Sequence, residues 1–100
     1  MSAPLGPIVE AEIRERFPAA DVAAVIARLE RAVLPFGSRA APSERPRVHL
    51  AIIKLAEGNL EKLGRAVEVA EQDWRDVLVA SGFGNADWRE AIARAGMRVP

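Results

Sequence analysis

The sequence contains no cysteine and no tyrosine, and it has a single histidine. Without cysteine the chain can form neither a disulfide framework nor a thiolate nucleophile, and zinc held by cysteine is excluded as well. One histidine cannot supply a usual zinc site, although clustered carboxylates could hold a harder cation. We therefore expect a protein without a metal or another cofactor.

The chain also carries no net charge, because 14 basic side chains balance 14 acidic ones. This balance argues against a nucleic-acid binder or a protein of the membrane surface. No apolar run approaches the ~20 residues that a membrane span requires, and residues 1–7 lack the basic and apolar regions of a signal peptide. We expect a cytoplasmic protein with no membrane contact.

Aromatic residues make up only 5% of the chain, while hydrophobic residues, many of them alanine, make up 50%. An alanine-rich composition without tyrosine favours helix over sheet. A chain of 100 residues forms one domain and buries roughly two thirds of its unfolded surface. The composition predicts a small all-α domain of four or five helices over residues 8–100, preceded by a flexible tail over residues 1–7.

Apolar residues spaced by three and four positions, together with capping and stop signals, divide the chain into helical segments. Pro18 ends the first segment, and the run 36–45 has the composition of a long, mobile loop. A buried strand is the alternative for residues 48–56, and a break near Asp73 is the alternative to one continuous fourth helix. The predicted helices are residues 8–16, 22–33, 46–56, 60–81 and 86–95.

The sharpest junction in the sequence is Gly58-Asn59. Glycine suits the left-handed position that follows a helix, and asparagine can cap the next helix. A tight αα-hairpin formed by residues 46–81 is expected there, and it would be the centre of the domain.

The C-terminal third contains a near-repeat, in which residues 73–83 are echoed by residues 87–97. Each copy begins with Asp-Trp-Arg and ends with a glycine followed by an apolar residue. Aspartate suits a helix N-cap, glycine suits the left-handed position, and the apolar residue can fold back onto the helix. The repeat is interpreted as two helix-forming units, and it indicates no chemistry.

Two stretches in the second half of the chain carry a resemblance to known sequences. They are Ala51-Ile52-Ile53-Lys54-Leu55-Ala56-Glu57-Gly58-Asn59-Leu60 and Asp73-Trp74-Arg75-Asp76-Val77-Leu78. With these stretches, residues 47–83 resemble a group of short, uncharacterised bacterial proteins. The resemblance implies a small bacterial helical protein of unknown function, and no site residue follows from it.

His49 is the first candidate for acid–base chemistry, because it alone has an unperturbed pKa near neutrality. Its position inside the apolar arc of its predicted helix favours a packed, hydrogen-bonded core histidine over a catalytic one. Asp73 and Asp76 could pair as acid and base, but a capping role for Asp73 is the simpler interpretation. Ser38 and Ser43 have no partner base, so we assign no catalytic residue and expect no enzyme.

Trp74 and Trp88 occupy apolar helical positions and are expected in the core. Leu50, Val69 and Val79 differ, because they lie outside the main apolar stripes of their helices. Large apolar residues on polar faces indicate a second buried surface, which a symmetric partner could cover. These three are the predicted partner-binding residues.

The sequence therefore predicts a non-enzymatic helical protein that associates with itself or with an unidentified protein partner. We expect a homodimer whose interface includes residues 46–81 and buries at least ~1,000 Å². One alternative is a small regulatory nucleic-acid-binding protein that uses a local cluster of Arg39, Arg45 and Arg47. A second alternative is a small-ligand-binding or enzymatic role near His49.

Overall fold

The computed structural model describes residues 5–35 and 43–100, and most of these residues are helical. These residues form six α-helices and one short 3-10 helix, and they contain no strand. The all-α prediction is confirmed, with one more helix than the largest number expected. The elements are α1 (Pro7–Arg16), η1 (Ala19–Asp21), α2 (Val22–Arg31), α3 (Glu44–Ala56), α4 (Leu60–Gln72), α5 (Trp74–Ser81) and α6 (Trp88–Arg94).

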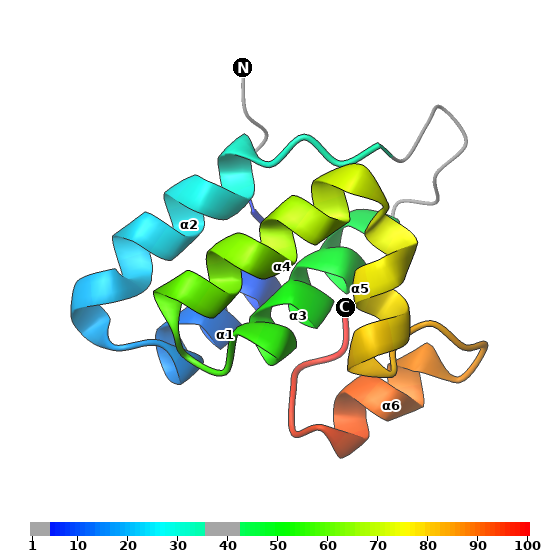
Figure 1. Ribbon diagram of the computed structural model, residues 1–100. Helices are drawn as coiled ribbons and strands as arrows, with labels where there is room; N and C mark the ends of the chain where they lie inside the picture. Colours follow the sequence, from blue (N-terminus) through cyan, green and yellow to red (C-terminus); the bar gives the residue numbers. More distant parts are fainter. Residues whose placement is uncertain (1–4, 36–42) are drawn as a thin grey trace.

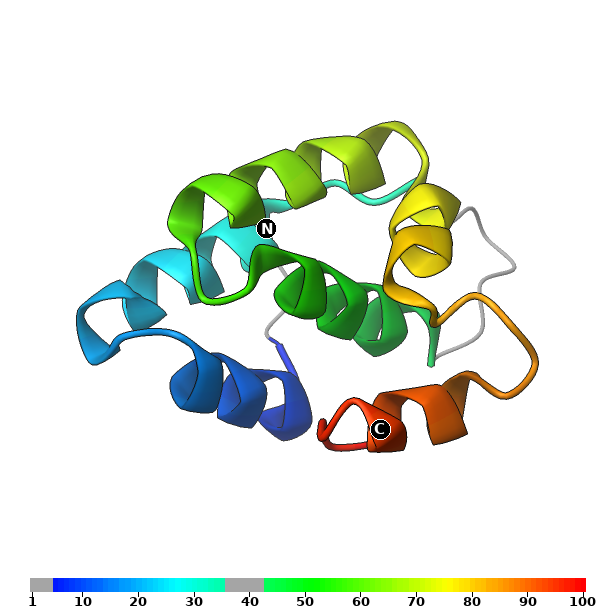
Figure 2. The same ribbon diagram turned by 60° about the horizontal axis from the view of Figure 1, so that its bottom comes forward.

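The helix α3 lies at the centre of the fold, and α1, α4 and α5 pack against it (Figure 1, Figure 2). The helix α2 packs on α1 and α4. The helix α6 lies near the C-terminal end of α5, where residues of both helices line one hollow (Figure 1). Because neighbours enclose α3 on several sides, six consecutive residues, 48–53, are buried. A helix that is apolar on most of its circumference is typical of such a central position.

The turn between α3 and α4 contains two left-handed residues, Glu57 with φ 51° and Gly58 with φ 74°. Asn59 then caps α4, because its side-chain oxygen accepts a hydrogen bond from the backbone N–H of Lys62 at 3.0 Å. Packing also requires glycine at position 58, where a Cβ would lie 2.8 Å from the carbonyl oxygen of Arg16 in α1. The predicted left-handed Gly58 and the predicted Asn59 cap are both confirmed.

A break at Asp73 separates α4 from α5 (Figure 1). Asp73 has an extended backbone (φ −154°, ψ 103°), and its Oδ1 accepts a hydrogen bond from the backbone N–H of Arg75 at 3.1 Å. The capped start of a new helix explains why the prediction of one continuous helix over residues 60–81 is wrong. Residues 46–81 therefore belong to three helices, not to a two-helix hairpin.

The two copies of the C-terminal repeat end in the same way. Gly82 and Gly96 take left-handed conformations, with φ 84° and 76°. The backbone N–H groups of Phe83 and Met97 each donate to the carbonyl oxygen five residues earlier, at 2.9 and 3.2 Å. Both of these side chains fold back and are buried. The interpretation of the repeat as two helix-forming units is confirmed.

The sequence predicts that residues 1–7 and 36–45 are mobile, but the parts of these segments that the structure describes are packed or helical. The helix α1 begins at Pro7, and Leu5 is buried against the core, so residues 5–7 belong to the packed domain. Residues 1–4 and 36–42 lie outside the described residues. In the remainder of the predicted loop, α3 already begins at Glu44.

The core draws side chains from every α-helix of the described chain. Trp88 in α6 is buried, as expected. Trp74 in α5 is only half-buried, and its Nε1 donates a hydrogen bond to the carbonyl oxygen of Pro35 at 3.2 Å. The core position predicted for Trp74 is therefore confirmed only in part.

Candidate functional site

The three residues predicted to bind a partner lie in different environments. Leu50 is fully buried (0% exposed), so its assignment to a partner surface is wrong. On a helical wheel Leu50 lies between Lys54 and Glu57, which predicts an exposed position. In the fold, α1, α4 and α5 enclose α3 on several sides, so Leu50 is buried all the same. Val69 in α4 and Val79 in α5 are exposed, by 42% and 77%.

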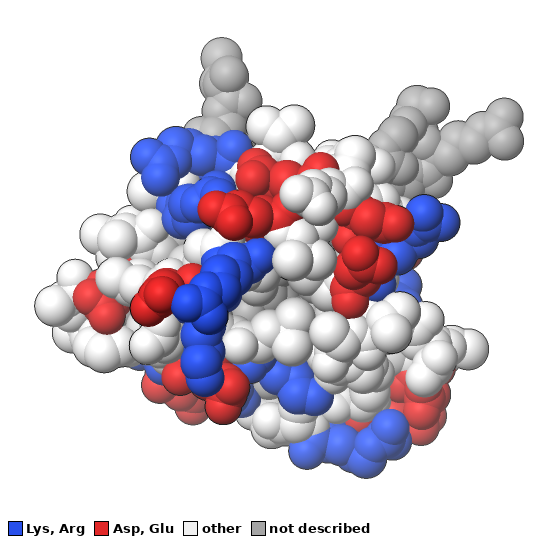
Figure 3. All heavy atoms as spheres, viewed as in Figure 1, with Lys and Arg blue, Asp and Glu red and all other residues white. Residues whose placement is uncertain are grey.

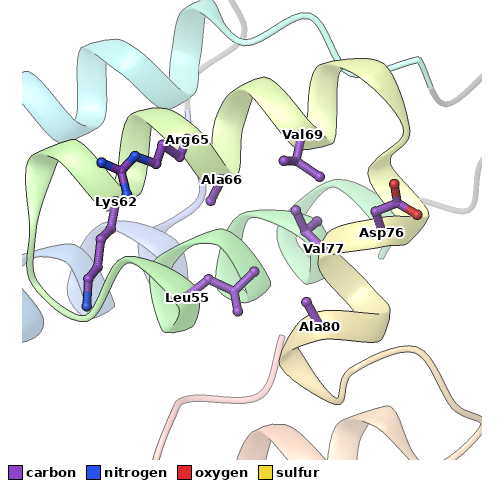
Figure 4. A pocket seen from close by; sticks show the side chains of 8 residues that line it. All are labelled: Leu55, Lys62, Arg65, Ala66, Val69, Asp76, Val77 and Ala80. Carbon is purple, nitrogen blue, oxygen red and sulfur yellow. The ribbon is translucent and has the colours of Figure 1, made fainter.

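Val69 borders an apolar groove that runs between α4 and α5, with Leu55 of α3 beneath it (Figure 4). The groove has a volume of about 270 Å³. Its middle is apolar, and its charged lining residues stand at its two ends. We call it the α4–α5 groove, and its lining residues are Leu55, Lys62, Arg65, Ala66, Val69, Asp76, Val77 and Ala80.

The groove follows from the break at Asp73 and from the small side chains beside it. The break turns α5 away from the axis of α4, so the two helices diverge (Figure 1). Ala66 on α4 and Ala80 on α5 are too small to fill the angle between them. Val77 is buried at the base, and an apolar surface remains open to solvent.

Charges of opposite sign mark the two ends of the groove. Lys62 and Arg65 stand at one end, and Asp76 stands at the other (Figure 4). In the space-filling view of this face, a basic ridge over the first half of α4 is separated by uncharged surface from acidic side chains near the α4–α5 junction (Figure 3). Lys62 pairs with Glu57 at 3.1 Å and Arg65 pairs with Glu61 at 2.6 Å, both on the exposed surface.

His49 is a core residue of α3, with 2% of its surface exposed. Its Nε2 has no hydrogen-bond partner in the described part of the chain, so the core position is confirmed and the hydrogen bond expected at this atom is absent. Burial, with a smaller contribution from the charge of Arg45, lowers the pKa of His49 from 6.5 to about 4. The hollow of about 220 Å³ beside it is lined also by Gly6, Val9 and Pro46. At neutral pH this imidazole is uncharged and a weak base.

The arginines of the nucleic-acid hypothesis do not form an exposed group in the described chain. Arg39 lies outside the described residues. The side chain of Arg47 is only 12% exposed and pairs with Glu44 at 3.3 Å. Its Nε donates to the carbonyl oxygen of Phe83 at 2.8 Å, and its guanidinium lies 4.9 Å from the centre of the Trp88 ring. Arg47 is therefore engaged within the fold.

The Asp73 carboxylate at the α4–α5 junction has structural contacts. Asp73 caps α5 and also pairs with the Arg75 side chain at 3.0 Å, and this hydrogen bond lowers the pKa of Asp73.

Ser43 precedes α3 at its N-cap, and Ser38 lies outside the described residues. Across residues 5–35 and 43–100, no three His, Cys, Asp or Glu side chains gather where they could hold a metal ion.

Glu12 is a buried carboxylate that sequence patterns did not single out. Its side chain is 0% exposed and accepts hydrogen bonds from Arg16 Nε at 2.9 Å and from the backbone and guanidinium of Arg98. Burial raises the pKa of Glu12, but the hydrogen bonds from the two arginines outweigh it, so the pKa lies below its usual value. The sequence indicates this contact only by spacing, because Glu12 lies one turn after the apolar Val9 and Arg16 follows four residues later. Glu12 ties the C-terminal residues to α1.

Comparison with known proteins finds no relative of the chain. It matches no protein-family model, no curated protein and no solved structure. None of the helices in the described part combines the length and the apolarity that a membrane crossing requires. The resemblance to short bacterial proteins stays a prediction.

Proposed function

We propose that the protein is a non-enzymatic, self-associating helical protein, and that two copies meet through the α4–α5 groove. The observation that carries the proposal is an apolar lining left open to solvent, with Val69 exposed at its edge. Apolar surface of this kind gains free energy when a partner removes it from water.

A second copy of the chain is the proposed occupant because of the charges at the two ends of the groove. Lys62 and Arg65 lie at one end and Asp76 at the other. When two copies meet about a twofold axis through the middle of the groove, each basic end lies over the partner's acidic end. The surface is therefore complementary to itself.

The size of the contact sets a further requirement. A stable dimer buries at least ~1,000 Å² in total, which exceeds the lining of the groove alone. The exposed faces of α4 and α5 beside the groove would contribute the rest, and Val79 on α5 offers further exposed apolar surface. This extended contact retains two of the three residues predicted from the sequence.

The proposal is tested by placing the same charge at two exposed valines. Val69→Lys puts an ammonium group into the groove, whereas Val33→Lys puts it at a valine that is 76% exposed and does not line the groove. We expect Val69→Lys to raise the dimer dissociation constant at least about tenfold, because the interface would bury an unpaired charge. The control should leave the constant unchanged. Sedimentation velocity measures both constants.

Circular dichroism and thermal melts show whether both variants keep the fold of the unmodified chain. Equal dissociation constants for the two variants would contradict the groove as the contact surface. An unmodified chain that stays monomeric at every concentration would contradict self-association itself.

A further inference from the structure

We propose that Asp76 determines the register of the dimer by facing the partner's Lys62 and Arg65. The inference rests on the proposed self-association through the α4–α5 groove. It adds a specific pair of contacts that selects one arrangement of the two copies over others.

The acidic end of the groove has a carboxylate, that of Asp76, which forms no ion pair with a described residue, although its charge acts on the neighbouring Arg75. Asp76 is exposed. The neighbouring cation, Arg75, is paired with Asp73, with 3.0 Å between Nε and Oδ1. Asp76 is therefore the acidic group at this end that can accept a basic side chain from a second molecule.

The basic end is held by contacts that a partner can replace. The Lys62–Glu57 and Arg65–Glu61 pairs lie on the surface, with side chains 49% to 75% exposed. Exposed pairs of this kind contribute little to stability and exchange partners readily. A carboxylate of a second copy, brought over an apolar groove from which water is excluded, would attract these cations more strongly than in open solvent.

Twofold symmetry makes the contact sensitive to charge reversal. Each copy supplies one acidic and one basic end, so a single substitution alters the dimer twice. Reversing the charge at either end places like charges together in both contacts, which opposes this register. Reversing opposite ends on two different chains restores attraction in both.

The experiment uses two complementary variants of the full chain. The acid-end variant is Asp76→Lys, and the basic-end variant is Lys62→Glu/Arg65→Glu. All three positions are exposed. We expect each variant alone to have a dimer dissociation constant raised at least about tenfold, and an equimolar mixture to form a heterodimer about as readily as the unmodified chain dimerises. Sedimentation velocity with one variant fluorescently labelled measures the heterodimer.

Two further variants control for folding and for net charge. Asp76→Asn removes the charge with little change in shape, and it should weaken the dimer less than Asp76→Lys does. Arg14→Glu reverses an exposed charge on α1, outside the groove, and it should leave association unchanged.

The outcomes separate this inference from the proposal on which it rests. If the unmodified chain dimerises and the acid-end variant dimerises equally well, the register is wrong while self-association stands. A mixture that fails to recover association also overturns the register. If the unmodified chain is monomeric throughout, the proposed function fails, and the register fails with it.

Discussion

At the scale of single residues, His49 makes stability depend on pH. Burial holds the pKa of His49 at about 4 in the folded chain, against 6.5 for an unperturbed histidine. As the pH falls from 6.5 to 4, the unfolded chain binds a proton that the folded chain does not bind. The free energy of unfolding is therefore expected to fall by about 3 kcal/mol across this window. Urea denaturation at a series of pH values measures the change.

The control for this prediction is His49→Leu, which removes the ionisable ring but retains an apolar side chain. Its stability should depend less on pH in the same window. At neutral pH, His49→Leu should lower the free energy of unfolding only slightly, because His49 Nε2 has no hydrogen-bond partner to lose among the described residues. Parallel stability curves for the two proteins would show that His49 is not the titrating group.

Gly58 holds a close approach between the α3–α4 turn and the end of α1. A side chain at this position meets an unfavourable positive φ and a Cβ contact of 2.8 Å to the carbonyl oxygen of Arg16. Gly58→Val is expected to lower the free energy of unfolding by at least about 1–2 kcal/mol. Gly64→Ala is the matched control, because α4 leaves open space there and alanine favours helix. Equal stability of the two variants in chemical denaturation would contradict the account of this turn.

At the scale of elements, the Asp73 cap is the device that separates α4 from α5. Its equivalent in the repeat, Asp87, makes no capping hydrogen bond and instead pairs with Arg94 at 3.3 Å. Asp73→Ala should therefore lower the midpoint of thermal unfolding by roughly 4–8 °C, and Asp87→Ala should lower it less. Differential scanning calorimetry compares the two. A larger effect at Asp87 would contradict the role given to the Asp73 cap.

Helices and most of their ends could be predicted from local sequence, because capping and glycine signals act within a few residues. Gly58, Asn59 and the two repeat glycines all end or begin helices as expected. The sequence favours one continuous helix over a break at Asp73. An apolar spacing of three and four continues through it, and that spacing does not distinguish one long helix from two shorter ones that pack on the same core.

At the scale of the whole molecule, the arrangement of helices could not be predicted from the wheel of each helix. Leu50 shows the reason, because a helical wheel assumes one buried face, whereas α3 has neighbours on several sides. The groove is a tertiary feature of the same kind. Its residues come from α3, α4 and α5, and no local pattern brings Leu55, Val69 and Ala80 together. Of the predicted partner residues, Val69 and Val79 are exposed because they lie on outer helices.

Self-association through the α4–α5 groove is tested by the mass of the unmodified protein in solution. Sedimentation equilibrium over a wide range of concentrations should give a mass that rises toward twice the 10.8 kDa of one chain and falls back on dilution. Added salt should weaken the association, because charges at both ends of the groove contribute to it. A mass of one chain at every concentration would contradict self-association.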